Sequence, residues 1–323
     1  MTPIHQARIE GPSAWTPASI GGKEGLVRTL TAAQIAAIDE LLRATRHLRM
    51  EDIRLSEFDH PALTPFLSGI RDQIMHREGA AIIRGVDADK YSREDCERIF
   101  WGFGTHWGKA AVQSARADRI GYVRHEPSDP RGYRSSDELV LHTDSRPIIA
   151  LMSIQNAASG GYSQVASSMT IHNIIRHERP DLLPPLYEGH QYLSNELDLT
   201  PCKIPVFSDV DGVVTCMFFE PHIRKAARKI GQIDPLMDEA VRFFRQVADR
   251  EDVRLHFMLE RGEIMVCNNF SVLHARTEFE NSADRQRLLL RLWLNTPDGR
   301  PTVPEVHYKS REFDRMFDPE FAG

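Results

Sequence analysis

The sequence predicts a mainly β fold with flanking helices, of the α+β class. The first 78 residues show helical periodicity, and strand-length apolar runs separated by turn residues follow from about residue 119. A charged segment with helical periodicity interrupts those runs at residues 223–253. With 323 residues, 41% of them hydrophobic, the chain can bury one substantial core. We expect a single domain over 1–323, because no repeat and no long Gly/Ser linker divides it.

The N-terminal part, residues 1–78, is predicted to be mainly helical. The segment 31–48 opens with a Thr and a Gln spaced as a capping box, and its apolar residues recur at helical spacing. A second helical pattern covers about 61–76. It leads into GAAIIRGVD, an apolar run between two glycines that is typical of a buried strand.

The region 79–300 is predicted to form the sheet-rich core. Its apolar runs include VLHTDSRPIIALMSIQNA, VVTCMFF, IMVCNNFSVLH and RLLLRLWLN. The helical segment 223–253 keeps its apolar residues on one face, so we expect an insertion packed on the sheet. Residues 301–323 are predicted to be a C-terminal tail.

Composition excludes several classes of protein. The net charge of −6 gives no basic stripe for nucleic acid. No run of about 18 apolar residues and no leader-like N-terminus occurs, so we expect a soluble, cytoplasmic protein that does not enter membranes. The sequence leaves the oligomeric state open, with a homo-oligomer among the alternatives. The cysteines form no C-x-x-C pair, and we expect buried, reduced thiols at Cys96, Cys202, Cys216 and Cys267.

His142 and Asp144 form the first candidate site, at the end of a strand-like run. A spacing of two residues puts both side chains on one face of a strand, where they can reach one metal ion. A second histidine would complete a two-His-one-carboxylate set, which suits Fe(II) and leaves coordination positions open. A similar triplet, from His76 to Glu78, lies at a predicted helix end, where a histidine offsets the helix dipole.

A distant segment, from Cys267 onward, carries a further histidine and two arginines. His274 follows a strand-like run, and Arg287 and Arg291 lie in another strand. Period-two alternation places both arginines on one face and a stripe of leucines on the other. Buried guanidinium groups need anions, and a dicarboxylate cosubstrate would supply one. Alternatively, the two arginines pair with internal Asp or Glu residues, or their aliphatic chains cover apolar surface while their guanidinium groups are exposed.

The chain resembles the taurine dioxygenase family over roughly residues 79–295. Three blocks carry the resemblance: GYRSSDELVLHTDS from Gly132, GGYSQVASSMTIHNII from Gly160 and VLHARTEFENSADRQRLLLRLWL from Val272. The resemblance implies a double-stranded β-helix, or jelly-roll core, flanked by helices. It also implies an enzyme that uses Fe(II), 2-oxoglutarate and O2 to hydroxylate or desaturate a small organic substrate, with release of succinate and CO2.

The resemblance also implies residue roles. His142, Asp144 and His274 would be the iron ligands, and Arg287 would bind the distal carboxylate of 2-oxoglutarate. Arg291 resembles a second family arginine that contacts either cosubstrate or substrate. Ser163 stands where the family often has a Thr that bonds the same carboxylate, and a turn serine after Gly-Gly is its alternative.

The substrate is the least determined part of this prediction. An amino acid or related small acid is expected if Arg291 binds a carboxylate. Arg134, Asp137 and Glu138 precede the metal motif and are candidate substrate contacts, with a solvated loop held by local ion pairs as the alternative. Two other functions use the same ligands: a zinc-dependent hydrolase, which no H-E-x-x-H motif supports, and a non-catalytic barrel that binds a metal or ligand.

Overall fold

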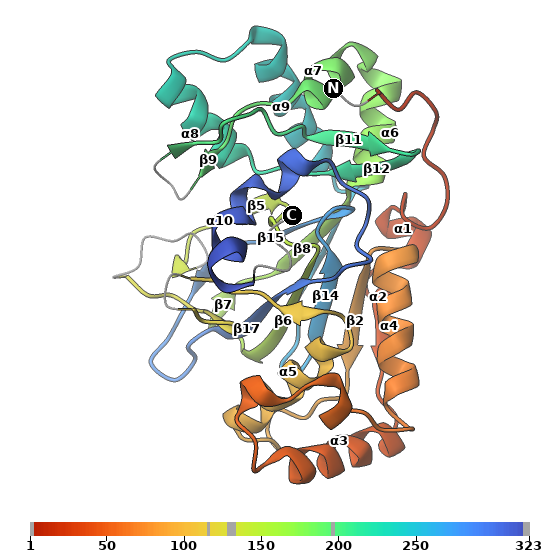
Figure 1. The fold of residues 1–323 in the computed structure, drawn as a ribbon, viewed down its shortest axis with the longest axis vertical. Coiled ribbons are helices and arrows are strands. Elements are labelled where there is room, and N and C mark those ends of the chain that lie inside the picture. Colours follow the sequence, from red (N-terminus) through yellow and green to blue (C-terminus); the bar gives the residue numbers. More distant parts are fainter. Residues whose placement is uncertain (1–2, 115–116, 128–133, 195–197, 319–323) are drawn as a thin grey trace.

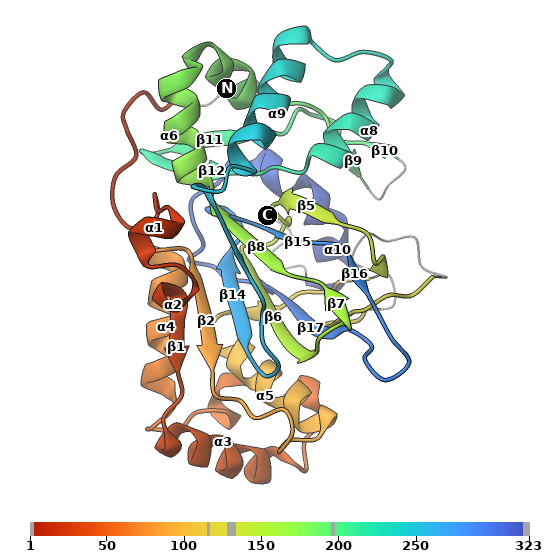
Figure 2. The ribbon, with the colours of Figure 1, turned by 180° about the vertical axis from the view of Figure 1, so that it is seen from behind.

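Two β-sheets face each other at the centre of the molecule, and helices cover their outer faces (Figures 1 and 2). The structure is a computed structural model, and it describes residues 3–114, 117–127, 134–194 and 198–318. Helices α3 and α5 lie at one end of the molecule and α6 to α9 at the other, with the sheets between them (Figure 1).

The larger sheet has the strand order β1-β2-β14-β6-β17-β3, and β4 also pairs with β17. Only the β1–β2 pair is parallel, and the other pairs are antiparallel. The strands are β1 (Val27–Thr29), β2 (Ala80–Arg84), β3 (Lys109–Ala110), β4 (Gly121–Val123), β6 (Ile148–Gln155), β14 (Ile264–Asn268) and β17 (Leu288–Asn295). The predicted strand after Gly79 is therefore confirmed as β2. The N-terminal part also contributes a strand, β1, which the helical prediction for 1–78 omits.

The smaller sheet has the order β13-β8-β15-β5 and is antiparallel throughout. Its strands are β5 (Leu139–His142), β8 (Ser163–Ser167), β13 (Arg254–Phe257) and β15 (Val272–Arg276). Three short pairs lie outside the two sheets: β7 (Ser159–Gly160) with β16 (Phe279–Glu280), β9 (Leu193–Ser194) with β10 (Asp198–Leu199), and β11 (Phe207–Val210) with β12 (Val213–Cys216). Together the two sheets form the double-stranded β-helix that the family resemblance implies.

The interior between the sheets is apolar over most of its length. It combines larger-sheet residues such as Ile149 and Leu289 with smaller-sheet residues such as Val165 and Val272. Successive side chains of a strand point to opposite faces of the sheet. In β17, Leu290, Leu292 and Leu294 therefore point away from the barrel interior and pack against helices. The two faces predicted for this leucine-rich strand are thus confirmed for its apolar residues.

Helices α3 (Ala32–Thr45), α4 (Thr64–His76) and α5 (Arg93–Thr105) cover the outer face of the larger sheet. The capping box of Thr31 and Gln34 is present at the start of α3, as predicted. The sequence pattern did not indicate α5, although Ser92 and Asp95 form a capping box there too. Short helical turns join these elements: α1 (Pro17–Ile20), α2 (Lys23–Leu26), η1 (Met50–Asp52) and η2 (Leu55–Glu57).

A second helical layer covers the outer face of the smaller sheet. It consists of α6 (Ser168–Glu178), η4 (Pro180–Leu182), α7 (Leu183–Glu188), α8 (Glu220–Ile230) and α9 (Pro235–Ala248). The predicted helical segment 223–253 is two helices rather than one. Gly231, in the left-handed region at φ 88°, ends α8, and Asp234 caps the start of α9 through the amides of Leu236 and Met237.

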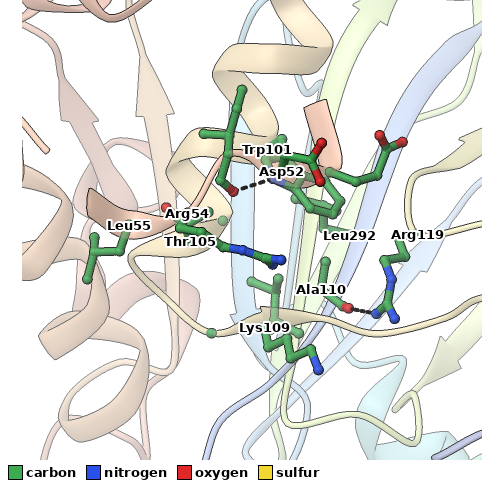
Figure 3. A pocket seen from close by; sticks show the side chains of 14 residues that line it. Asp52, Arg54, Leu55, Trp101, Thr105, Lys109, Ala110, Arg119 and Leu292 are labelled. Atoms are coloured by element: carbon green, nitrogen blue, oxygen red, sulfur yellow. Dashed lines mark hydrogen bonds between the residues drawn. The ribbon is translucent and has the colours of Figure 1, made fainter. Parts of the chain in front are cut away.

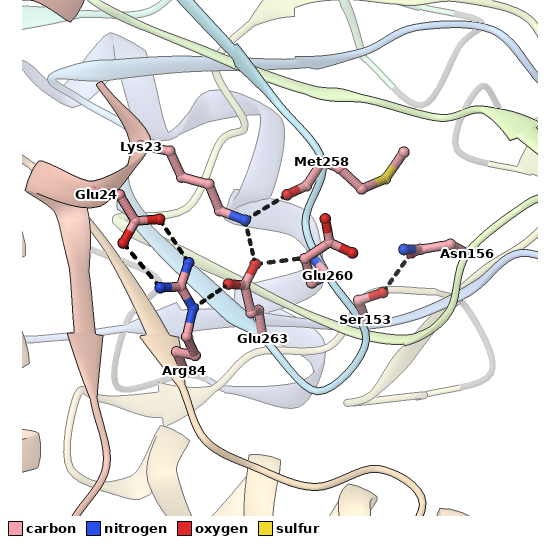
Figure 4. A network of polar contacts seen from close by, with 8 residues as sticks. All are labelled: Lys23, Glu24, Arg84, Ser153, Asn156, Met258, Glu260 and Glu263. Carbon is pink, nitrogen blue, oxygen red and sulfur yellow. Dashed lines mark hydrogen bonds and ion pairs between the residues drawn. The ribbon is translucent and has the colours of Figure 1, made fainter. Parts of the chain in front are cut away.

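A network of charged side chains fixes the N-terminal segment to the larger sheet (Figure 4). Glu263 is 2% exposed and accepts from Lys23 at 2.7 Å and from Arg84 at 2.9 Å. Arg84 also makes a two-bond pair with Glu24, at 2.9 and 2.8 Å. Because the carboxylate of Glu263 is shared by two cations, its burial is compensated, and α2 is held against β2.

The segment predicted as a C-terminal tail contains a helix. After η5 (Pro304–His307), α10 (Tyr308–Phe317) is the last helix of the described chain (Figure 1). Asp314 of α10 forms an ion pair with Arg146, and both residues are 3% exposed. Just past the helix, Asp318 pairs with Arg119 at 3.0 Å and with Lys109 at 3.2 Å. These contacts attach the C-terminal segment close to the β5–β6 connection.

The cysteines are all free thiols, with Cys96, Cys216 and Cys267 buried as expected. Cys202 is only half-buried, which corrects the expectation for that position. Over the part of the chain that the structure describes, every helix is too short or too polar to cross a bilayer.

We expect the substitution Asp314→Ala to lower the free energy of unfolding by about 3–5 kcal/mol, because it leaves the buried Arg146 guanidinium without its carboxylate. Urea unfolding of the metal-free protein measures this. Asp52→Ala is the matched control, since it breaks the exposed Arg49–Asp52 pair, and the unfolding midpoint should then stay unchanged. Equal midpoints for the two variants would show that α10 is not held by this ion pair.

Candidate metal centre

The pairing of β5 with β15 brings two distant histidines together. His142 ends β5 and lies directly opposite His274 in the antiparallel register. Their ring centroids are 4.3 Å apart. Beyond this pair, Leu139 lies opposite Arg276, so three residue steps on β5 span two on β15. Such a bulge re-aims the side chains beside it, and bulges are common next to active sites.

Asp144 follows β5 and completes the group. Its carboxylate lies 3.8 Å from Nε2 of His142 and 3.5 Å from Nε2 of His274. One ligand atom from each residue lies within 4.8 Å of the other two, and no other such group occurs among the described residues. Burial by itself raises the pKa of the Asp144 carboxyl, but the hydrogen bond and charge of His274, with His142 and Arg291, bring it well below its usual range.

Hydrogen bonds fix the orientation of these side chains. Nδ1 of His142 donates to the carbonyl of Val140 at 2.8 Å, which leaves Nε2 to face Asp144 and His274. The indole Nε1 of Trp293 donates to the Asp144 carboxylate at 2.7 Å. The backbone amide of Asp144 donates to the side chain of Asn269, at 3.3 Å. The donors are therefore held in place by their neighbours.

The chemistry of this donor set fits Fe(II). Two imidazole nitrogens and one carboxylate oxygen on one side of a site form the arrangement that non-haem iron oxygenases use, with further positions open. All three side chains lie within the barrel and are 16% exposed or less. The structure brings together the three residues predicted as metal ligands.

Arg287, the predicted cosubstrate residue, lies just before β17 and is 4% exposed. Its Nη1 is buried and has no hydrogen-bond partner among the described residues. Burial, with the positive charge of Arg276, lowers the pKa of its guanidinium to about 9. A buried cation with no carboxylate beside it fits a site whose anion comes from a ligand.

Gly161 makes room for the Arg287 side chain. Its φ is +74°, and a Cβ at this position would lie 3.0 Å from Nε of Arg287 and 3.2 Å from its Cδ. A larger residue would therefore be strained and would also push the arginine away. Ser163, two residues later, begins β8 and is 4% exposed. Its partner across the β8–β15 pair is Arg276.

Arg276 is a buried residue that the sequence reasoning missed. It ends β15, two residues after His274, and is 5% exposed. The signal was present, because the same period-two spacing that links His142 to Asp144 also links His274 to Arg276. Asn269 and Gln113 were also missed, since their contacts depend on the folded chain.

Arg291 has a different environment from Arg287. Its Nε donates to Oε1 of Gln113 at 2.8 Å, and its guanidinium carbon lies 4.1 Å from the centre of the Trp293 ring. Gly121 lies opposite Arg291 across β4 and β17, and a Cβ there would meet Gln113 Oε1 at 2.5 Å. Since Trp293 bonds Asp144, Arg291 is on the metal side of the strand.

The loop residues predicted as substrate contacts have local or solvent-exposed surroundings. Arg134 forms an ion pair with Glu126 of the same loop, while Asp137 and Glu138 are exposed. The Arg134–Glu126 pair agrees with the alternative to a substrate role, which is a solvated loop held by local ion pairs. A substrate role for Arg134 or Glu138 stays a prediction.

A surface cavity of about 610 Å³ lies on the opposite side of β17 (Figure 3). Its lining includes Trp101, Lys109 and Leu292. Leu292 belongs to the helix-covered face of the sheet, whereas Arg291 and Trp293 point to the other side. The sheet therefore separates this cavity from the metal centre.

The sequence is similar to those of a known family and of a Streptomyces enzyme. The family model described as "Taurine catabolism dioxygenase TauD, TfdA family" matches residues 29–293. The FR-33289 synthase of Streptomyces rubellomurinus is 27% identical in an alignment of 330 positions, which covers 95% of this chain and 96% of that protein.

Solved structures of oxygenases share the fold. Asparagine oxygenase, in complex with Fe(II), 2S,3S-3-hydroxyasparagine and succinate, superposes with a TM-score of 0.68 at 14% identity, over 85% of this chain and 98% of that one. The non-haem iron oxygenase OrfP, in complex with Fe, succinate and (3S)-hydroxy-L-Arg, gives 0.63 at 14% identity, over 84% and 94%.

Trp293→Phe is expected to weaken Fe(II) affinity about 10- to 100-fold, because it removes the hydrogen bond to Asp144 but keeps an aromatic ring at that position. Anaerobic calorimetric titration with Fe(II) measures the affinity. Trp107→Phe is the matched control, since that indole donates to Leu67 in the helix-covered core, and it should leave the affinity unchanged. Wild-type affinity in Trp293→Phe would mean that Asp144 needs no such support.

Proposed function

The chain belongs to the taurine catabolism dioxygenase TauD, TfdA family and is an Fe(II)- and 2-oxoglutarate-dependent dioxygenase, and we propose that it hydroxylates a small organic acid held by Arg291. Family membership favours this class of enzyme over the zinc hydrolase and the non-catalytic barrel. The observation that carries the site assignment is the cross-strand pair of His142 and His274 with Asp144 beside it.

His142, Asp144 and His274 hold the iron in this proposal. Their donor atoms converge from two paired strands and one turn, and each is buried or nearly so. Nε2 of His142 is directed to the metal because its other ring nitrogen is engaged by Val140. Trp293 and Asn269 act as positioning residues for Asp144.

Arg287 and Ser163 bind the distal carboxylate of 2-oxoglutarate in this proposal. The support is the burial of Arg287 and its unpartnered Nη1. Guanidinium matches carboxylate with two parallel hydrogen bonds, and these bonds strengthen in a buried site. Gly161 leaves the space that the Arg287 side chain occupies, because a side chain at residue 161 would push Arg287 away.

Arg291 binds an anionic group of the primary substrate. It lies over Trp293, which itself contacts Asp144, so an anion at Arg291 would lie close to the metal ligands. The organic ligands of the two oxygenase complexes include hydroxyasparagine and hydroxyarginine, which are amino acids and therefore carry a carboxylate. An amino acid or related small acid is the substrate class that this arrangement supports.

Phe219 forms a wall beside the metal ligands. Its ring centroid lies 5.0 Å from that of His142. The preceding residue, Phe218, exchanges backbone and hydroxyl hydrogen bonds with Thr143, at 2.8 and 2.9 Å, so this segment is fixed to the end of β5. An apolar wall of this kind orients the substrate and limits access of water.

The reaction converts a substrate C–H, 2-oxoglutarate and O2 into C–OH, succinate and CO2. Bound iron with cosubstrate supplies the oxidant that cleaves the C–H bond. The protein holds the ligands on one side, anchors both acids by arginines and directs one C–H group toward the metal. Trp293 and Asn269 restrain Asp144, so its carboxylate would stay in position to hold the iron.

Anaerobic protein with Fe(II) and 2-oxoglutarate is expected to show a weak visible charge-transfer band. His142→Ala should abolish the band by removing a ligand. Arg287→Gln should raise the 2-oxoglutarate concentration needed for half of the band about 10- to 100-fold, because a charge-assisted bond is lost. His76→Ala, at the end of α4, is the control and should keep the band. A normal band in His142→Ala would refute the assignment of this ligand.

Arg291→Gln is expected to raise the KM for the primary substrate about 10- to 100-fold, while 2-oxoglutarate affinity changes little. A screen of amino acids and small acids for succinate formation and a product 16 mass units heavier identifies the substrate first. Gln113→Ala tests positioning, since it removes the partner of Arg291 but no charge. A parallel loss of 2-oxoglutarate affinity in Arg291→Gln would assign this arginine to the cosubstrate instead.

A further inference from the structure

Two buried arginines flank the same aromatic ring near the metal centre. The guanidinium carbon of Arg276 lies 4.7 Å from the centre of the Phe279 ring, and that of Arg287 lies 5.1 Å from it. They are 5% and 4% exposed, respectively. The positive charge of Arg276 acts unfavourably on that of Arg287. Two cations are rarely buried side by side unless an anion joins them.

The described residues supply almost no partners for these two groups. The Arg287 side chain forms no ion pair with any described acid, and its Nη1 is buried without a hydrogen bond. Arg276 donates from Nη2 to the carbonyl oxygen of Asp137, whereas its Nε and Nη1 are buried and unpartnered. Unsatisfied donors of this kind are costly unless a ligand completes them.

Strand geometry places Arg276 on the same side as the metal ligand His274. The β15–β8 register is regular from Val272 to Arg276, so residues two apart share a face. Arg276 also lies directly opposite Ser163, and side chains of opposite residues in such pairs begin about 4.5–5.5 Å apart. Arg276, Ser163 and Arg287 therefore gather at one end of the barrel interior.

We propose that Arg276 is a second arginine of the cosubstrate pocket, and that it binds the distal carboxylate of 2-oxoglutarate together with Arg287. This inference rests on the function proposed above. A carboxylate between the two guanidinium groups accepts hydrogen bonds from both and offsets their mutual repulsion. One arginine alone would leave the other buried charge uncompensated.

A purely structural role for Arg276 makes a different prediction. Its bond to the carbonyl of Asp137 could serve only to anchor the loop before β5, which also bonds through Ser136 to the amide of Phe279 at 3.1 Å. In that case its loss would affect all ligands of the site equally. A 2-oxo acid that lacks the distal carboxylate therefore separates the two roles.

The test is an anaerobic titration of the Fe(II)-loaded protein with 2-oxoglutarate and with 2-oxopentanoate, followed by the visible charge-transfer band. Both acids have the 2-oxo and C1 carboxylate groups, but only 2-oxoglutarate has the distal carboxylate. Arg276→Gln is expected to weaken 2-oxoglutarate binding about 10- to 100-fold and to leave 2-oxopentanoate binding unchanged. Arg285→Gln, which removes an exposed arginine two residues before Arg287, should change neither affinity.

Arg276→Lys is the second variant, because it keeps a cation that can still bond Asp137. It should lose part of the 2-oxoglutarate affinity, since an ammonium group cannot make the paired bonds of a guanidinium group. Unchanged 2-oxoglutarate binding in Arg276→Gln, or equal losses for both acids, would overturn the proposal. If the wild type bound iron but gave no band with 2-oxoglutarate, the function proposed above would fail instead.

Discussion

The two imidazoles of the candidate site can share one metal ion because β5 and β15 are paired in register. His142 and His274 are opposite residues in that pair. A slip of one residue would turn His274 to the outer face of the sheet. Such a slip is opposed on both faces of β15, because Val272 packs inside the barrel while Leu273 and Ala275 pack against the second helical layer.

The same register connects the metal centre to the cosubstrate pocket. Because β15 pairs regularly with β8, the strand that carries His274 also sets Arg276 against Ser163. Arg287 enters from the opposite sheet, next to Gly161. The barrel interior thus has an apolar part, filled by side chains from both sheets. It also has a cationic part, whose positive charge a bound anion would compensate. Ligands that complete such a site stabilise the folded state by mass action.

Local signals were sufficient for many elements of the fold. Capping residues and helical spacing predicted α3, and a glycine-bounded apolar run predicted β2. They were insufficient for α10, whose position depends on a buried ion pair with Arg146, 168 residues away. The strand β1 is only three residues long, and its pairing with β2 supplies the order that its own sequence does not.

The candidate site divides in the same way. Spacing alone placed His142 beside Asp144, and the family resemblance linked them to His274 and Arg287. The difference between Arg287 and Arg291 could not be read from spacing, because Gln113, which bonds Arg291 but not Arg287, is 178 residues away from Arg291 in sequence. Period-two spacing puts Arg276 on the same face of the strand as His274, but spacing does not reveal its neighbours across the fold, Ser163 and Phe279.

One iron ion should bind where β5 and β15 meet, with 2-oxoglutarate anchored by buried arginines. Anaerobic crystals grown with Fe(II) and 2-oxoglutarate, measured at the iron absorption edge, would locate both. We expect a single strong anomalous peak shared by His142, Asp144 and His274, with cosubstrate density reaching Arg287. A peak at other residues, or cosubstrate density directed away from Arg287, would contradict this expectation.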